Sequence, residues 1–74
     1  MIIEGMKIRF RPSGWGDGQD YPKLKIPDKV TGTVTYVSRH LCVVEAEYDG
    51  VTIRECFGIR KGVLQDRSVE VVRR

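Results

Sequence analysis

Apolar and polar residues alternate most regularly in residues 42–48 and 51–57. The two segments read Cys-Val-Val-Glu-Ala-Glu-Tyr and Val-Thr-Ile-Arg-Glu-Cys-Phe, and Asp49-Gly50 lies between them. An Asp-Gly pair between alternating β-forming segments is a strong signature of a hairpin with a two-residue type I′ turn. Because such a turn fixes the register, the sequence also predicts which residues face each other across the hairpin.

This register, in which Tyr48 faces Val51, sorts the hairpin side chains onto two faces. The face toward the core takes the apolar residues Cys42, Val44, Ala46, Tyr48, Val51, Ile53 and Phe57. On the other face Glu45 lies across from Arg54, and a cross-strand ion pair of this kind stabilises a sheet by roughly a few tenths of a kcal/mol.

Two segments upstream of the hairpin carry the same two-residue period. In residues 6–11 the apolar residues alternate with three cations, which are Lys7, Arg9 and Arg11. In residues 30–37 the threonines take one face and the other face takes Val30, Val34 and Tyr36. Gly32 lies inside this second segment and indicates a bend, a bulge or a close approach of two backbones.

Downstream of the hairpin the pattern is shorter. Residues 69–72 predict a brief strand, and residues 61–66 predict one helical turn because they are too few for a stable helix. No segment keeps an amphipathic helical pattern over three turns. We therefore expect a single all-β domain spanning residues 1–74, with about five short antiparallel strands. Closure into a small barrel would remove the exposed edges of such a sheet.

The predicted order of elements resembles the SH3-like small barrel, with residues 11–29 in the place of its long first loop. The stretch Val30-Thr-Gly-Thr-Val-Thr-Tyr-Val37 is similar to the Gly-x-Val core of KOW-type barrels, which often bind RNA or ribosomal surfaces. The resemblance implies that the first and last strands pair.

A closer resemblance is to small uncharacterised proteins encoded by phages and prophages of Gram-positive bacteria. Those proteins carry Gly-x-Val-x-Tyr-Val, then Val-Glu-x-Glu-Tyr, then Arg-Glu-Ser-Phe. The matching stretches here are Gly32 to Val37, Val44 to Tyr48, and Arg54 to Phe57, with Cys56 in place of the usual serine. This resemblance implies a cytoplasmic bacterial or phage-infected setting and brings no assigned activity.

The segment 11–29 holds all three prolines and does not show a strand pattern. Loops longer than about 12–15 residues are uncommon in compact domains and are often functional or disordered. The candidate binding residues of this loop are Trp15, Tyr21, Lys23 and Lys25. Two interpretations of Trp15 stay open: it covers one open end of the barrel, or it contacts a ligand.

The net charge of +3 is unevenly distributed along the chain. The basic residues concentrate near the two ends, and the central hairpin is acidic. If the first and last strands pair, one basic edge forms from eight residues, which are Lys7, Arg9, Arg11, Arg60, Lys61, Arg67, Arg73 and Arg74. Such an edge is suited to nucleic acid, with Trp15 or Tyr21 stacking on a base. The other interpretation is a solvated edge that discourages strand addition.

Few residues offer catalytic or metal-binding chemistry. The predicted register directs Cys42 and Cys56 to opposite faces, so we expect two free thiols in a reducing compartment rather than a disulfide. His40, the one histidine, lies in a predicted turn. Two cysteines without CxxC spacing and a single histidine do not make a four-ligand zinc site. We therefore expect no enzyme activity, no cofactor and no metal.

Glu55 breaks the hairpin pattern, because the register places it on the core face between Ile53 and Phe57. A buried carboxylate needs a cation or hydrogen-bond donors. Three explanations stay open. Glu55 lies at a rim in contact with water, or a bulge near Cys56 rotates it outward, or it anchors the long loop through a lysine or arginine.

These observations together predict a small binding module. The first partner expected is nucleic acid or a nucleoprotein, held by the basic edge. The alternative is a protein partner or a homo-oligomer, held by the aromatic loop or by a strand edge. No apolar run approaches the roughly 20 residues of a membrane helix, and no secretory signal is evident, so we expect a cytoplasmic protein without a membrane partner.

Overall fold

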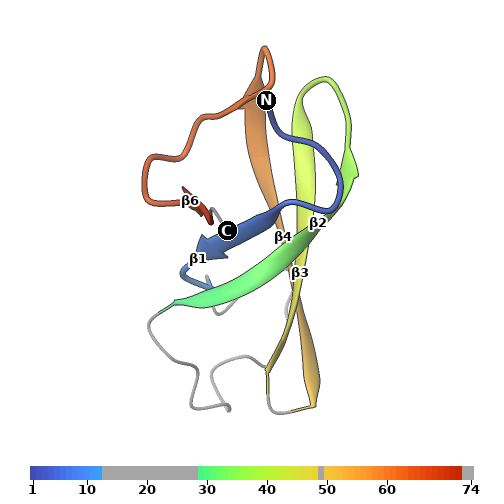
Figure 1. Cartoon of the computed structure of the whole chain (residues 1–74), viewed down its shortest axis with the longest axis vertical. Helices are drawn as coiled ribbons and strands as arrows, with labels where there is room; N and C mark the ends of the chain where they lie inside the picture. Colours follow the sequence, from blue (N-terminus) through green and yellow to red (C-terminus); the bar gives the residue numbers. More distant parts are fainter. Residues whose placement is uncertain (13–28, 49, 73–74) are drawn as a thin grey trace.

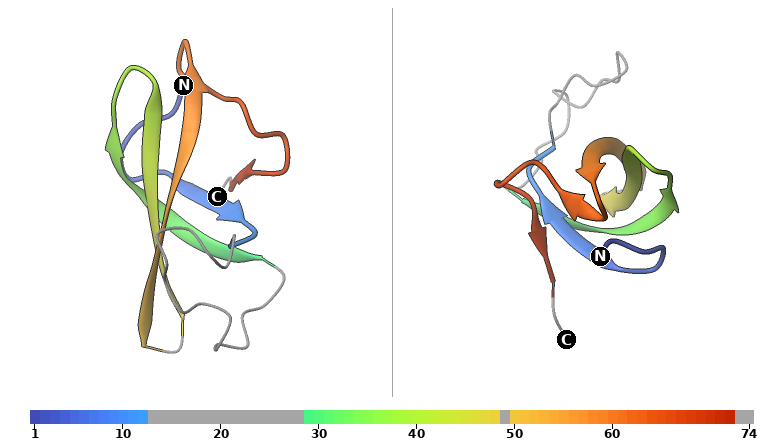
Figure 2. Two further views of the ribbon diagram at one scale, coloured as in Figure 1. Left: turned by 180° about the vertical axis from the view of Figure 1, so that it is seen from behind. Right: turned by 90° about the horizontal axis from the view of Figure 1, so that it is seen from above.

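The structure, a computed structural model, describes residues 1–12, 29–48 and 50–72. The strands in this part of the chain are β1 (Lys7–Phe10), β2 (Val30–Val37), β3 (Leu41–Tyr48), β4 (Val51–Arg60), β5 (Val63–Leu64) and β6 (Glu70–Val71). They form one antiparallel sheet in the order β5-β4-β3-β2-β1-β6. The sheet curls into a half-barrel (Figure 1; Figure 2, right). This confirms the all-β prediction and is consistent with a small barrel.

The β3–β4 hairpin has the predicted register. Tyr48 faces Val51 at the turn, and the pairing runs without a break to Leu41 and Gly58. Gly50 has a φ of 79°, and a type I′ turn requires a positive φ at this position. The buried core residues of the hairpin are Cys42, Val44, Ala46 and Ile53.

Strand β1, near the N-terminus, pairs with β2 on one side and with the C-terminal strand β6 on the other. Its apolar residues Ile8 and Phe10 are fully buried, and the Phe10 ring meets Phe57 of β4 edge-on with the centroids 5.4 Å apart. On its other side β1 pairs with β6, where Arg9 faces Glu70. The expected pairing of the first and last strands is therefore confirmed.

Strand β2 differs from the prediction at one residue. Tyr36 is 53% exposed rather than on the core face. The cause is a β-bulge, because the register against β3 shifts between Val34, which faces Val44, and Tyr36, which faces Val43. The extra residue turns Tyr36 outward.

Gly32 in the same strand is explained by a close backbone approach. A Cβ at this position would lie 2.7 Å from the Glu45 carbonyl oxygen and 2.8 Å from Val44 Cγ1. Only glycine leaves room for β3 to pass at this distance. Of the three explanations for Gly32, the close approach holds, and the bulge lies further along the strand.

The predicted helical turn at residues 61–66 is wrong. Strand β4 instead reverses into β5 through Lys61 and Gly62, which have φ values of 53° and 79°. Arg60 then faces Val63 across the turn. A helical turn needs negative φ, whereas two consecutive positive φ values define the type I′ hairpin turn.

The N-terminal residues complete the core beside this turn. The Ile2 backbone N–H donates to the Gly62 carbonyl at 2.9 Å, and the Ile2 side chain is buried. Ile59 of β4 is buried in the same cluster. Figure 1 shows the N-terminus next to the β4–β5 turn.

Candidate functional site

The outer surface of β1 and its two neighbours carries a group of cations that we call the basic face. Its members are Lys7, Arg9, Arg11 and Lys29. Lys7 and Arg9 are exposed because they alternate with the buried residues Ile8 and Phe10. Arg11 directly follows β1 and is exposed, and Lys29 directly precedes β2.

Cross-strand contacts hold two of these cations in place. Lys7 Nζ donates to Thr33 Oγ1 of β2 at 2.8 Å. Lys29 Nζ donates to Glu70 Oε2 of β6 at 3.0 Å. This hydrogen bond and the charge of Lys29, with a smaller contribution from Arg9, hold the pKa of Glu70 below its usual range.

The charges on the basic face do not cancel. Glu70 is the one carboxylate that the described strands β1, β2 and β6 carry, and it is paired with Lys29 and faces Arg9. A surface with this excess attracts anions, and adjacent strands place its charges in rows. The arrangement suits a ligand that carries several negative charges along its length.

Two other predicted cations lie elsewhere. Arg60 and Lys61 are exposed at the β4–β5 turn, where Ile2 donates to Gly62 and Met1 lines the same hollow as Lys61. Figure 1 shows this turn next to the N-terminus. The single basic edge expected from the sequence is therefore divided, because β2 and β3 separate β4 from β1 in the sheet. Outside the described residues lie Trp15, Tyr21, Lys23, Lys25 and Arg73.

Glu55 faces Val44 and is partly exposed. Pairing continues without a shift through Cys56 and Phe57, so the explanation that a bulge near Cys56 rotates Glu55 outward is wrong. Its partial exposure agrees with contact with water at a rim. The predicted anchoring of the long loop concerns residues that lie mainly outside the described ranges.

The two cysteines are free, with Cys42 buried and Cys56 exposed on the opposite face. This confirms the prediction for the thiols. Burial raises the pKa of the Cys42 thiol, which keeps it protonated and poorly reactive. Within residues 1–12, 29–48 and 50–72, no three His, Cys, Asp or Glu side chains gather into a potential metal site.

One exposed side chain beside the basic face was not expected from the sequence. Tyr36 is turned outward by the bulge and lies across from Val43. Val37, which is half-buried, takes the core-facing position opposite Cys42. The only sequence signal is that the core-facing residues Val34 and Val37 are three positions apart, which breaks the two-residue period.

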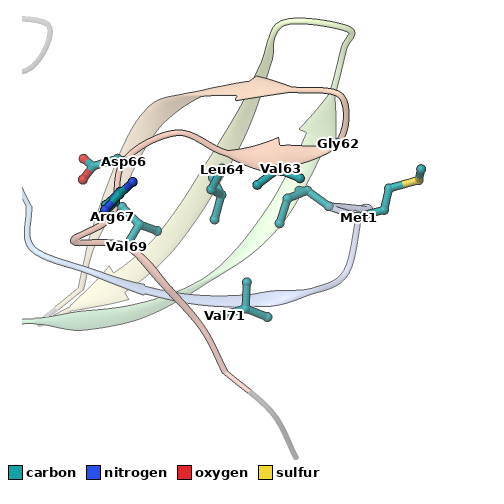
Figure 3. A pocket seen from close by; sticks show the side chains of 9 residues that line it. Met1, Gly62, Val63, Leu64, Asp66, Arg67, Val69 and Val71 are labelled. Atoms are coloured by element: carbon teal, nitrogen blue, oxygen red, sulfur yellow. The ribbon is translucent and has the colours of Figure 1, made fainter.

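A hollow of about 260 Å³ lies on the open side of the half-barrel, between β5 and β6 (Figure 3). Its apolar lining comes from Met1, Ile2, Val63, Leu64, Val69 and Val71, and Asp66 and Arg67 lie at its edge. Met1 and Val63 are 90% and 59% exposed. The open side therefore presents apolar surface next to two end strands.

Comparison of the chain with protein-family models, with curated proteins and with solved structures found no match. Among the described residues, no helix is long and apolar enough to cross a membrane.

Proposed function

We propose that this protein is a non-catalytic module that binds nucleic acid through the basic face. The observation that carries the proposal is that four cations lie on or directly beside β1 and β2, whereas Glu70 is the one carboxylate on the described strands β1, β2 and β6. The proposal also places the protein in the cytoplasm of a bacterial or phage-infected cell. Its resemblance to phage-encoded proteins and its two free thiols support this location.

Binding of a phosphate backbone to this surface is favoured by the release of counterions. Each cation that neutralises a phosphate releases condensed counterions, and this release makes affinity fall with salt concentration. If all four cations contact phosphates, log K should fall against log salt with a slope of about −3 to −4. A slope of this size distinguishes phosphate binding from an apolar contact.

The test is fluorescence anisotropy with labelled single-stranded and duplex oligonucleotides across a salt series. The variant Lys7→Gln/Arg9→Gln removes two charges from the basic face. The matched control Arg60→Gln/Lys61→Gln removes two charges from the β4–β5 turn. We expect the first variant to lose about 10- to 100-fold in affinity and the control to bind like the native protein. No binding at low salt, or equal losses in both variants, would contradict the proposal.

The open side of the half-barrel favours a second candidate function, which is pairing with a strand from another copy of the chain. Strands β5 and β6 end the sheet, and the apolar hollow lies between them. End strands of this kind readily add a further strand. Sedimentation of the native protein and of Val63→Lys tests this: a dimer that the substitution dissociates supports it, and a monomer in both cases excludes it.

A further inference from the structure

We propose that the nucleic acid is single-stranded and that one of its bases stacks on Tyr36. This inference rests on the proposed function and specifies its ligand. It begins from the bulge in β2, since a bulge interrupts the hydrogen-bonded ladder and redirects a side chain.

The register shows what the bulge changes. With the pairing of Val34 and Val44 continued regularly, Tyr36 would face Cys42 on the core side. The extra residue instead gives Val37 that place and moves Tyr36 to the outer surface, across from Val43. The core therefore receives a valine, and the tyrosine is left outside it.

The surroundings of Tyr36 leave its ring accessible. The residue is 53% exposed, and Thr35 beside it is exposed as well. Across Val43, the next outward residue in the row is Cys56 of β4, which is also exposed. An accessible aromatic ring on a small β-sheet provides a platform for one base, because every base has a π-face.

A cation lies on one side of this ring along the strand. Thr33, three residues before Tyr36, accepts the hydrogen bond of Lys7 Nζ. Arg39 in the β2–β3 turn is exposed as well, but it borders a hollow with Val37 and Lys61 rather than the outer face of Tyr36. The nearest carboxylate on the outer face of β3 is Glu45, and Arg54 Nε donates to it at 2.9 Å. A phosphate on the β1 side of a stacked base would therefore meet positive charge.

A duplex cannot stack a base on Tyr36 as a single strand can. Its bases are stacked on one another inside the helix, so their faces are not available to a side chain on a convex surface. A single strand offers both a charged backbone and free base faces, which matches a group of cations with one aromatic ring beside it.

The experiment measures affinity for oligothymidylate and oligouridylate of about 12 nucleotides, and for a duplex of the same length. Tyr36→Ala removes the ring, Tyr36→Phe keeps it, and Val63→Ala is a control for truncation of an exposed side chain at the open side. Urea unfolding of each variant reports whether the fold is kept. The two homopolymers show whether the single strand bound best is DNA or RNA.

We expect Tyr36→Ala to lose about 5- to 150-fold in affinity for the single strands, with its salt slope and its duplex affinity unchanged. Tyr36→Phe and Val63→Ala should bind like the native protein. If native protein binds both ligands and Tyr36→Ala binds equally well, this inference is overturned and the proposed function stands. If native protein binds neither ligand, both are overturned.

Discussion

The basic face and the outer face of the β3–β4 hairpin differ in their balance of positive and negative charge. On the basic face, Glu70 is the one carboxylate of the described strands β1, β2 and β6; it accepts a hydrogen bond from Lys29 and faces Arg9. On the outer face of the β3–β4 hairpin, Glu45 is paired with Arg54, and Glu47 is exposed beside them. The Glu45–Arg54 pair is neutral and Glu47 leaves the hairpin face net acidic, whereas the basic face carries an excess of positive charge.

This difference separates charges that stabilise the sheet from charges that are available to a ligand. A cross-strand ion pair is neutral overall and attracts a distant anion weakly. An unbalanced row keeps a field that extends about a Debye length, or roughly 8 Å at physiological salt. A net charge of +3 for the whole chain conceals this contrast, because the acidic hairpin offsets the basic face.

The largest expected effect is a loss of folding stability from a substitution where the basic face meets the hairpin. Gly32 lies in β2, the strand of the basic face that pairs with β3 of the hairpin, and it faces Ile8 of β1. Because an added Cβ would meet the Glu45 carbonyl, Gly32→Ala should lower the free energy of unfolding by about 1–3 kcal/mol. Urea denaturation measures this change. Gly50→Ala is not a suitable control because its positive φ adds strain, so Thr31→Ala in the same strand is used. Equal stability of Gly32→Ala and the native protein would contradict the account of the close approach.

The second prediction compares one arginine from each surface. Arg9→Gln should weaken nucleic-acid binding by about tenfold, because one phosphate contact is lost. Arg54→Gln, an equal change of charge on the hairpin face, should leave affinity within about twofold of the native value. Anisotropy titrations at one salt concentration check both. The contrast between the surfaces would be broken by equal losses in the two variants.

The third prediction is a gain in affinity for nucleic acid rather than a loss. Glu70→Gln removes the carboxylate from the basic face and releases Lys29 from its ion pair, so affinity for nucleic acid should rise, by up to about fivefold. The salt dependence should become steeper at the same time. A fall in affinity would show that Glu70 positions the cations rather than opposing the ligand.

The fourth prediction concerns acid stability. Lys29 holds the pKa of Glu70 below its ordinary value of 4.5, so the pair stabilises the folded state above that value. The contribution is lost as the pH falls through the lowered pKa. Lys29→Gln should therefore be less stable than the native protein near neutral pH and equally stable in strong acid. Lys7→Gln, whose parent side chain contacts a threonine hydroxyl, is the matched control, and its difference from the native protein should not change over that range.

The smallest expected effect lies in the hairpin pair. Arg54→Gln should lower the free energy of unfolding by roughly a few tenths of a kcal/mol, since exposed cross-strand ion pairs contribute little. Urea midpoints of native and variant protein, measured at low and high salt, test this. A loss of more than about 1 kcal/mol would mean that the pair does more than balance charge.

The sequence predicts the fold best where a turn signature and the alternation of apolar and polar residues indicate the same strand pairing. Asp49-Gly50 fixes the β3–β4 register, and the alternation around it is long enough to assign every face. At the β4–β5 turn, Lys61 adopts a positive φ that few residues with a side chain take, and only two residues of strand follow. Neither the turn nor the strand was therefore visible in the pattern.

The same limit applies to the candidate site. The outward direction of Lys7 and Arg9 follows from their alternation with buried residues and was predicted. The outward direction of Tyr36 depends on one extra residue in β2, and the register against β3 determines where it is accommodated. The separation of Arg60 from the basic face depends on the order of the strands in the sheet, which local pattern does not encode.

The most direct test of the central claim, that the basic face and not the hairpin contacts nucleic acid, is amide chemical-shift mapping by NMR during titration with a short single-stranded oligonucleotide. The account predicts that the largest shifts fall on β1, on β2 up to Tyr36 and on β6, with the β3–β4 residues near Arg54 little changed. Shifts concentrated on the hairpin or around Val63 and Val69, or no shifts at low salt, would contradict it.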